Sequence, residues 1–179
     1  MPRLQQLQML QGHKSRLLEY VTYVDIPAIE RFVAMDVFGP KQDPAITGVK
    51  FELRGSFIYD FLGKIEENIE PVTVLIYRLQ NPARDSDIFA APNNGRILRL
   101  AHFYHMLKNS TMWFSFFDEE KICVTYIEDK NNRLKTVSAS WNPSAFQCLG
   151  IDIWDIFVCP VDHPLPWREG SLVLFQKIS

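Results

Sequence analysis

The 179-residue sequence has few cysteines, and none of them stand in the CxxC spacing of a metal-binding or redox pair. Cys123, Cys148 and Cys159 form an odd set, which favours a reduced, cytoplasmic setting over a disulfide framework. A disulfide between Cys148 and Cys159 is the alternative.

Glycine is also scarce, with 8 residues, which argues against a fibrous chain or an array of flexible linkers. No stretch approaches the roughly 18 consecutive apolar residues of a membrane span. The N-terminus carries glutamines between its leucines instead of the apolar core of a signal peptide. The 19 Lys and Arg against 21 Asp and Glu leave a net charge of −2, which provides no basic footprint for nucleic acid. We therefore expect neither a membrane nor a nucleic-acid partner.

The sequence does have enough apolar side chains for a full core, since hydrophobic residues make up 47% and aromatic residues 13% of the chain. A chain of this length is most simply one domain, which buries about 70% of the surface that its unfolded form exposes. We expect a single α+β domain over residues 1–179, in which residues 1–12 form a frayed arm.

The segment from Met112 to Trp141 is predicted to form three consecutive antiparallel strands, at 112–117, 122–129 and 134–141. The last two strands flank two asparagines, and asparagine tolerates the positive φ that a two-residue type I′ turn requires. A turn centred on the asparagines gives the cross-strand pairs Glu128–Lys135, Tyr126–Val137, Val124–Ala139 and Ile122–Trp141.

This register divides the three strands into two faces. The predicted core face holds Trp113, Phe117, Ile122, Val124, Tyr126, Val137, Ala139 and Trp141. The second face pairs Cys123, Thr125 and Ile127 with Ser140, Ser138 and Thr136, and it carries Met112, Phe114 and Phe116 beside this polar column. This half-apolar face is either covered by the chain's own helices or offered to a partner.

The remaining elements follow from periodicity and capping residues. Helices are predicted near residues 26–36, 56–69 and 95–108, and strands at 49–54, 72–79, 151–158 and 171–178. Residues 82–95 are predicted to be an exposed loop. This order favours helices packed on one face of a curved, mainly antiparallel sheet with a C-terminal meander. A cone-shaped sheet of the NTF2-like sort has the same order of elements, as an analogy of shape that carries no function.

A metal-dependent nuclease is the first catalytic class to consider, because Glu128, Asp129 and Lys130 form an E-x-K fragment with Asp118 upstream. In the predicted register Asp118 and Glu128 lie on opposite faces and about 20 Å apart, at 3.3 Å per strand residue. One divalent metal, with ligands about 2–2.6 Å away, does not bridge that distance. We interpret the fragment as a charged turn and expect neither a metal nor a cofactor.

Two histidine motifs are weaker signals. His102 and His105 stand at i and i+3 on one predicted helix, which would allow both to reach one metal. Nothing nearby in the sequence supplies the third ligand, so we interpret them as histidines at a helix–sheet boundary. His163 follows Asp162 in a proline-rich loop close to Cys159, and a thiol beside an imidazole is a possible nucleophile. A solvated loop is the alternative for this pair.

The aromatic residues Trp154, Trp167, Phe114 and Phe116 are candidates to line an apolar cleft, together with His102 and His105 at its border. With no phosphate-binding loop and no nucleophile elbow in the sequence, our leading hypothesis is a non-catalytic binding or accessory domain that associates with another protein or with itself. The alternative is a small-molecule-binding protein or enzyme with a pocket between the helices and the sheet.

Overall fold

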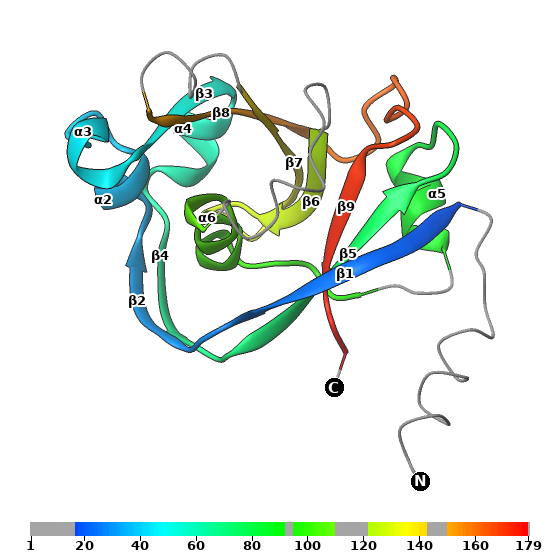
Figure 1. Cartoon of the computed structure of the whole chain (residues 1–179), viewed down its shortest axis with the longest axis horizontal. Coiled ribbons are helices and arrows are strands. Elements are labelled where there is room, and N and C mark those ends of the chain that lie inside the picture. The colour runs from blue at the N-terminus through cyan, green and yellow to red at the C-terminus, as the bar shows by residue number, and fades with distance from the viewer. Residues whose placement is uncertain (1–16, 92–94, 110–121, 143–149, 179) are drawn as a thin grey trace, which may run out of the picture.

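Strands dominate the structure, a computed structural model that describes residues 17–91, 95–109, 122–142 and 150–178 (Figure 1). The strands are β1 (Leu18–Ile26), β2 (Ile29–Val33), β3 (Val49–Gly55), β4 (Ile65–Ile69), β5 (Val72–Leu79), β6 (Ile122–Glu128), β7 (Leu134–Trp141), β8 (Asp152–Pro160) and β9 (Leu172–Gln176). The helices are α2 (Ala34–Phe38), α3 (Pro44–Thr47), α4 (Phe57–Phe61), α5 (Asp85–Ala90) and α6 (Leu100–Lys108).

Seven strands form one sheet of mixed orientation, in the order β1-β5-β9-β6-β7-β8-β3, and β2 and β4 form a separate pair. The neighbours β1/β5, β5/β9, β6/β7 and β7/β8 are antiparallel, whereas β6/β9 and β3/β8 are parallel. The strands predicted at 49–54, 72–79, 151–158 and 171–178 are confirmed as β3, β5, β8 and β9. The structure therefore agrees with the α+β class only in general terms: the chain is rich in strands, its main sheet is mixed, and its helices are short.

A long antiparallel ribbon, formed by β1 with β5 and by β2 with β4, bends at a pair of prolines. The ladder runs up to the pair Ile26 and Val72 and resumes at Ile29 and Ile69. Pro27 and Pro71 lie in the interruption, and proline cannot donate a ladder hydrogen bond. The predicted helix at 26–36 is therefore wrong over most of its length, because Pro27, which would suit the first turn of a helix, here separates two strands. Only residues 34–36 are helical, at the start of α2.

The predicted helix at 56–69 is correct only in its first half. Helix α4 ends at Phe61, and the chain continues into β4. Ile65 and Ile69 stand at helical spacing from Phe61, but Ile65 is 54% exposed and Ile69 is buried. The apolar positions therefore belong to two different elements, and the pairing of β4 with β2 decides their structure.

Helix α6 lies in the middle of the molecule, with β3 and β8 above it, β1 and β5 below it, and β2 and β4 beside it (Figure 1). Its N-terminus is closed by Glu66 of β4, whose carboxylate accepts hydrogen bonds from the backbone N–H groups of Leu100 (3.2 Å) and Ala101 (2.9 Å). The helix begins later than predicted, because the backbone of Arg96 pairs with Gln176 and so holds residues 96–98 extended.

The hairpin of β6 and β7 is confirmed, but its register is one residue away from the prediction. Tyr126 lies opposite Thr136, not Val137, and Glu128 lies opposite Leu134, not Lys135. The Asp129 backbone N–H donates to the Arg133 carbonyl (2.8 Å), so the loop inside this pair holds three residues, 130–132, of which only Asn132 has a positive φ, of 58°. The buried Asp129 accepts hydrogen bonds from the N–H groups of Asn131 (2.7 Å) and Arg133 (2.9 Å), which stabilises this longer loop.

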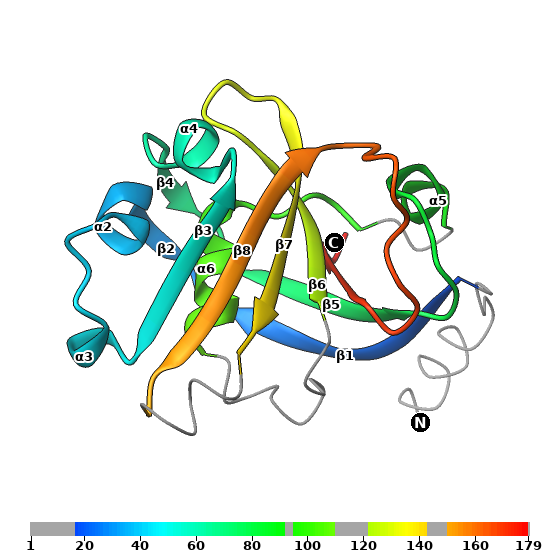
Figure 2. The ribbon, with the colours of Figure 1, turned by 90° about the horizontal axis from the view of Figure 1, so that it is seen from above.

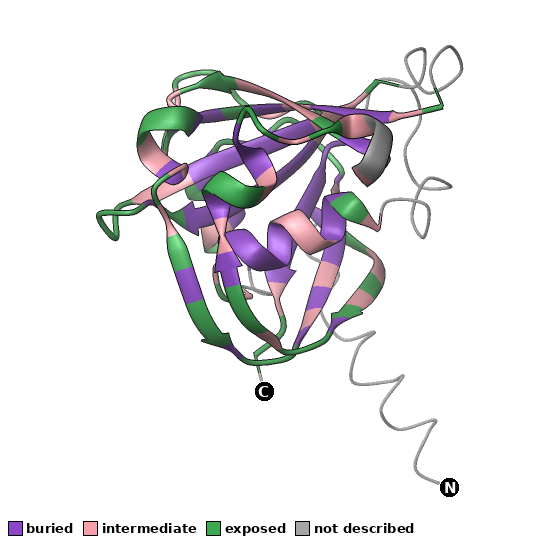
Figure 3. Cartoon of the chain, turned by 90° about the vertical axis from the view of Figure 1, so that its left-hand side faces the viewer, coloured by how far each residue is buried: buried purple, intermediate pink, exposed green. Residues whose placement is uncertain are grey.

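The shifted register changes which side chains share a face. On the inner face, toward α6, the buried cluster includes Cys123, Ile127, Val137 and Ala139 of the hairpin, with Trp154, Ile156, Phe103, Met106 and Leu107. On the outer face, a second cluster is formed by Leu18, Tyr77, Leu79, Ala83, Ile88, Ala91, Val124, Tyr126, Val173 and Phe175. We call them the inner cluster and the outer cluster. Figure 3 colours the chain by burial and shows buried stretches on the strands and on the helix in the middle of the molecule.

Helices contribute to both clusters, which corrects the prediction that they cover one face. Helices α2, α4 and α6 contribute to the inner cluster, whereas Ile88 of α5 belongs to the outer cluster. Residues 85–90 were expected to be loop, and they form α5 instead. The antiparallel meander consists of β6, β7 and β8, and β9 takes the place beside β6 that the segment 112–117 was expected to occupy. The segment 112–117 and the arm 1–12 lie outside the described residues.

Candidate functional site

A cavity of about 450 Å³ opens on the outer face of the meander, and we call it the outer groove. Its floor is formed by Arg54, Ile122, Ser138, Ser140, Asp155, Phe157 and Cys159. Its wall is formed by His163, Leu165, Pro166 and Trp167 of the loop between β8 and β9. Cavities of this size with mainly apolar walls and a few polar groups are typical ligand sites.

The sheet register determines the layout of the floor. Ser138 lies between Val124 of β6 and Phe157 of β8, and Ser140 lies between Ile122 and Asp155 in the next row. Hydroxyls therefore occupy the middle of the floor, and apolar side chains flank them. The polar column expected on β7 is present, although its partners on β6 differ from the predicted ones.

The wall is held by one buried carboxylate, that of Asp85, the first residue of α5. Oδ1 accepts hydrogen bonds from Trp167 Nε1 (2.7 Å) and the Tyr126 hydroxyl (2.8 Å). Oδ2 accepts from the Asp162 backbone N–H (2.8 Å) and the Thr136 hydroxyl (3.0 Å). These bonds fasten the β8–β9 loop and α5, which run past each other in Figure 2, to the sheet.

The β8–β9 loop contains a residue in a rarely populated backbone conformation. Asp162 has φ of 64°, in the left-handed region that glycine and, less readily, Asn and Asp adopt. The same residue donates its backbone N–H to Asp85, so the contact and the unusual conformation occur together. Such conformations cluster at functional sites, where the surrounding structure holds them.

The charges on the floor of the outer groove compensate one another. Arg54 Nε donates to Asp155 Oδ1 at 2.6 Å, and Arg54 also lies 3.4 Å from a carboxylate oxygen of Glu52. Of the described residues that line the groove, Asp155 alone carries a carboxylate, and it already has a cation. This described part of the groove therefore offers an occupant a surface whose charges are paired.

The thiol in the outer groove is poorly suited to nucleophilic chemistry. Burial, with a smaller contribution from Asp85, raises the pKa of Cys159 to about 11, so the thiol stays protonated near neutral pH. His163 also lines the groove, but its Nδ1 accepts a hydrogen bond from the Leu165 backbone N–H (3.3 Å). The pair predicted from the sequence is thus brought to one cavity, in an arrangement that supports binding rather than attack. Cys123 and Cys159 are both free cysteines, which removes the alternative of a Cys148–Cys159 disulfide.

A second, larger hollow of about 610 Å³ lies beside the N-terminus of α6 and is mostly polar. His102 lines it, and burial lowers the pKa of its imidazole, although the Glu66 carboxylate and the Glu70 backbone act in the opposite direction. The Arg99 backbone N–H donates to its Nδ1 (3.4 Å), and Lys64 forms an ion pair with Glu66 (3.4 Å). These charged groups are engaged in closing α6, so we interpret the hollow as structural.

The described residues of the predicted site lie apart from one another. Trp167 lines the outer groove, whereas Trp154 is fully buried in the inner cluster. His102 lies at the polar hollow, while His105, one turn later on α6, is half-buried and its pKa is lowered mainly by burial. Phe114 and Phe116 lie outside the described residues.

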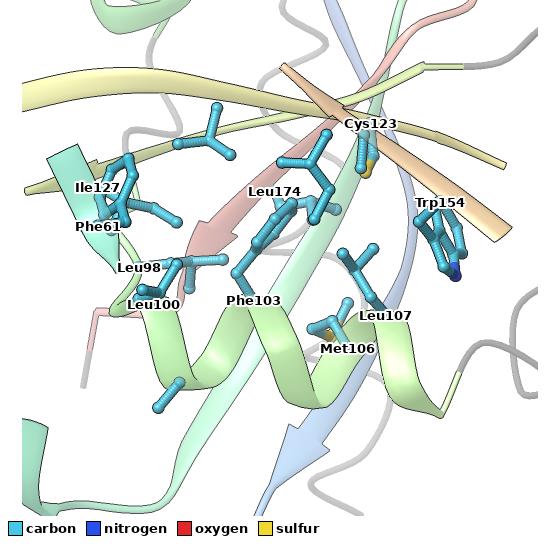
Figure 4. Close-up of a cluster of buried hydrophobic side chains, with 14 of the residues drawn as sticks. Phe61, Leu98, Leu100, Phe103, Met106, Leu107, Cys123, Ile127, Trp154 and Leu174 are labelled. Atoms are coloured by element: carbon cyan, nitrogen blue, oxygen red, sulfur yellow. The ribbon is translucent and has the colours of Figure 1, made fainter. Parts of the chain in front are cut away.

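The space between α6 and the sheet, where a pocket was the alternative expectation, is filled by side chains. Phe103, Met106 and Leu107 point from α6 toward Cys123, Leu174 and Trp154 of the strands (Figure 4). All six are fully buried. These side chains leave no room for a ligand between α6 and the strands that they contact.

The E-x-K fragment is explained by the hairpin loop. Burial alone would raise the pKa of Asp129, but hydrogen bonds from the Arg133 and Asn131 backbones, together with Lys135, lower it below its usual value. Lys135 was expected opposite Glu128, but its Nζ forms an ion pair with Asp60 Oδ2 at 2.9 Å. Among the described residues, no three His, Cys, Asp or Glu side chains are grouped as metal ligands would be.

Comparison of the chain with models of protein families, with curated proteins and with solved structures found no match. Within the described part of the chain, no helix has the length and apolar character needed to cross a membrane.

Proposed function

We propose that the protein is a non-catalytic binding domain that holds an apolar group of a protein partner in the outer groove. The observation that carries this proposal is that the groove is mostly apolar and that large apolar side chains which line it remain exposed. Phe157 is 43% exposed and Leu165 is 69% exposed, and both line the same cavity. Exposed apolar surface that gathers around a cleft is typical of protein-interaction sites.

The rigidity of the wall supports the same proposal. Four hydrogen bonds to Asp85 and the two prolines that flank Leu165 hold this side chain at the edge of the groove. A preformed wall lowers the entropy that binding must overcome. The protonated Cys159 thiol and the paired Asp155 leave binding, rather than bond making, as the chemistry of the site.

Peptide selection on the purified protein tests this proposal. Peptides are selected from a random library on the wild type, and their affinities are then measured for Leu165→Glu and for the control Ile178→Glu. Ile178 is an exposed aliphatic residue like Leu165, with 55% of its surface accessible, but it does not line the groove.

We expect Leu165→Glu to weaken the selected peptides by about tenfold or more, which corresponds to the loss of one buried apolar anchor. Ile178→Glu should leave the affinities unchanged. Light scattering on the same three proteins covers the case in which the partner is a second copy, because self-association through the groove is then lost in Leu165→Glu alone. If selection yields no peptide whose binding depends on Leu165, and the mass is the same in all three proteins, the proposal is wrong.

A further inference from the structure

The seven-stranded sheet has two outermost strands, β1 and β3, and their exposed side chains differ. Strand β3 carries the charged residues Lys50, Glu52 and Arg54, which form ion pairs along the strand (3.0 and 3.4 Å). Charged side chains on an edge strand oppose its pairing with another chain. Strand β1 instead presents Tyr20 and Tyr23, which are 49% and 56% exposed. Of the two edges, that of β1 is therefore the better suited to pair with a further strand.

A β-bulge places the two exposed tyrosines of β1 on the same face. The register between β1 and β5 shifts by one residue after Tyr20, so Val21 is an extra residue in the strand. Tyr20 lies opposite Tyr77, which its ring meets edge to face at 5.9 Å between centroids, and Tyr23 lies opposite Leu75. Tyr77 and Leu75 stand two residues apart on β5 and share a face, so the two tyrosines of β1 share it as well.

The hydrogen bonds at the start of β1 show which backbone groups point away from the sheet. The Gln80 backbone N–H donates to the Leu17 carbonyl at 2.9 Å, so Leu17 faces β5. Backbone groups alternate in direction along an antiparallel strand, so Glu19 also faces β5. The backbone N–H and C=O groups of Leu18 and Tyr20 therefore point outward, to the open side of β1.

The second half of β1 is oriented by the other side of β5. The Thr73 carbonyl accepts a hydrogen bond from the residue that follows β9 (2.8 Å), so Thr73 faces β9 and its neighbour Val74 faces β1. Val24 lies opposite Val74 and faces β5. The backbone groups of Tyr23 and Asp25 therefore point outward.

The outward-facing residues of β1 are spaced so that the strand matches itself. Leu18, Tyr20, Tyr23 and Asp25 follow one another at intervals of two, three and two residues, which read the same in both directions. When two copies of β1 lie antiparallel, Leu18 of each faces Asp25 of the other, and Tyr20 of each faces Tyr23 of the other. This antiparallel register is the only one in which all four outward-facing residues pair with outward-facing residues.

The acidic residues of β1 also favour this register. Asp25 faces Leu18 and Glu19 faces Val24 of the second copy, so no like charges lie opposite each other. A register centred on Thr22 would place Glu19 opposite Asp25, where the two carboxylates repel. Charge and backbone direction therefore select the same register.

We propose that the β1 strands of two copies of this chain pair antiparallel about a twofold axis at the bulge, which joins their two sheets into one. The dimer is stabilised by backbone hydrogen bonds between the edges and by two pairs of facing tyrosines on one side of the joined sheet. Two strands, β5 and β9, separate β1 from the meander that carries the outer groove. The inference therefore goes beyond the proposed function and does not depend on it.

Light scattering on the full chain over a range of concentrations tests the dimer, and a charge exchange tests its register. The double variants Tyr20→Lys/Tyr23→Lys and Tyr20→Glu/Tyr23→Glu should each raise the dissociation constant of the dimer by about tenfold or more, because like charges then face each other twice. An equimolar mixture of the two variants should restore the dimer, because each lysine then faces a glutamate. The control Tyr59→Lys changes a tyrosine of α4 that is 77% exposed, and it should leave the dissociation constant unchanged.

Amide hydrogen exchange of the wild type gives a second test, which does not depend on the folding of any variant. The outward-facing N–H groups of Tyr20 and Tyr23 should exchange more slowly as the protein concentration rises through the dissociation constant. The N–H of Val24 faces β5 and should exchange at the same rate at all concentrations.

A wild type that stays monomeric, or exchange at Tyr20 and Tyr23 that does not change with concentration, overturns the inference. A dimer that persists in both double variants, or a mixture of the two that stays monomeric, overturns it as well. A dimer that is lost in Leu165→Glu but kept in the β1 variants forms through the outer groove. That result contradicts the pairing of β1 while it supports the proposed function.

Discussion

The two faces of the β6–β7–β8 meander are made by the same strands but are covered differently. On the inner face, Val137 and Ala139 of β7 meet α6 and have no exposed surface. On the outer face, the neighbouring Thr136 is covered through Asp85, whereas Ser138 and Ser140 line an open groove. The inner side chains therefore contribute mainly to stability, and the outer ones remain available for contact with another molecule.

The largest expected difference between the faces comes from removing an aromatic ring. Phe103→Ala on α6 should lower the free energy of unfolding by about 3–5 kcal/mol, because its buried ring leaves a cavity in the inner cluster. Phe157→Ala on the outer face should cost less than about 1.5 kcal/mol, because that ring is 43% exposed. Urea denaturation measures both. Equal losses would show that the outer face packs as densely as the inner one.

The wall of the groove should be the part of the outer face that is sensitive to mutation. Asp85→Ala should lower the free energy of unfolding by about 3 kcal/mol, because Tyr126, Thr136 and Trp167 lose a charged acceptor in a buried place. It should also speed amide hydrogen exchange of Asp162, whose N–H is bonded to the same carboxylate. The control Asp87→Ala, at an exposed position of α5, should cost less and leave that exchange rate unchanged. Equal effects of both variants would contradict the role of Asp85.

The inner face should give the protein a pH-dependent stability through His102. Burial lowers the pKa of this histidine below its ordinary value of 6.5, so the folded state keeps it neutral. As the pH falls below 6.5, the unfolded chain binds a proton that the folded chain does not, and the free energy of unfolding decreases by at most about 1.4 kcal/mol per pH unit for this one site. The decrease ends once the pH passes the folded-state pKa. His102→Asn keeps an acceptor for the Arg99 N–H and should show a shallower decrease. Superimposable curves for the two proteins would contradict this cause.

The smallest effect tests the register that separates the two faces. Asn132 has a positive φ and Asn131 does not, so Asn132→Gly should raise the free energy of unfolding by about 0.5 kcal/mol. Asn131→Gly should lower it by a similar amount, because glycine there only adds flexibility to the unfolded chain. Stabilisation by both substitutions would indicate the two-residue type I′ turn and the other register.

The local spacing of apolar residues predicted most of the strands, but it did not predict which strands pair or in which register. In β5 the buried positions largely alternate with partly exposed ones, as expected for a strand with one face on a core, and sequence periodicity reports this directly. By contrast, β6 and β7 have continuous runs of buried residues, because both of their faces are covered. The register depends on Asp129, whose carboxylate binds two loop N–H groups and adds a residue to the turn. Two adjacent asparagines suggested a two-residue turn. Because the actual loop is one residue longer, the register of β7 against β6 differs by one residue, and this changes which side chains share a face of the sheet.

The helix predictions failed where distant segments determine the structure. Residues 29–33 and 65–69 were predicted to lie in helices, but they pair with each other as β2 and β4. Such long-range pairing is not encoded in a short window of sequence.

The candidate site was only partly visible in the sequence. Trp167, Cys159 and His163 were singled out and line the groove, and the serine column on β7 was recognised as polar. Asp85 and Phe157 were missed. An aspartate in a proline-rich region is ordinarily solvated, and nothing local indicates that four donors from three distant segments surround Asp85.

Amide chemical-shift mapping with a peptide selected on the wild type tests most directly the claim that the outer face binds and the inner face does not. We predict that the amides of Ser138, Phe157, Leu165 and Trp167 shift in a saturable manner, while those of α6 stay unchanged. Shifts confined to α6, or no saturable shift on the outer face of the meander, would contradict the account.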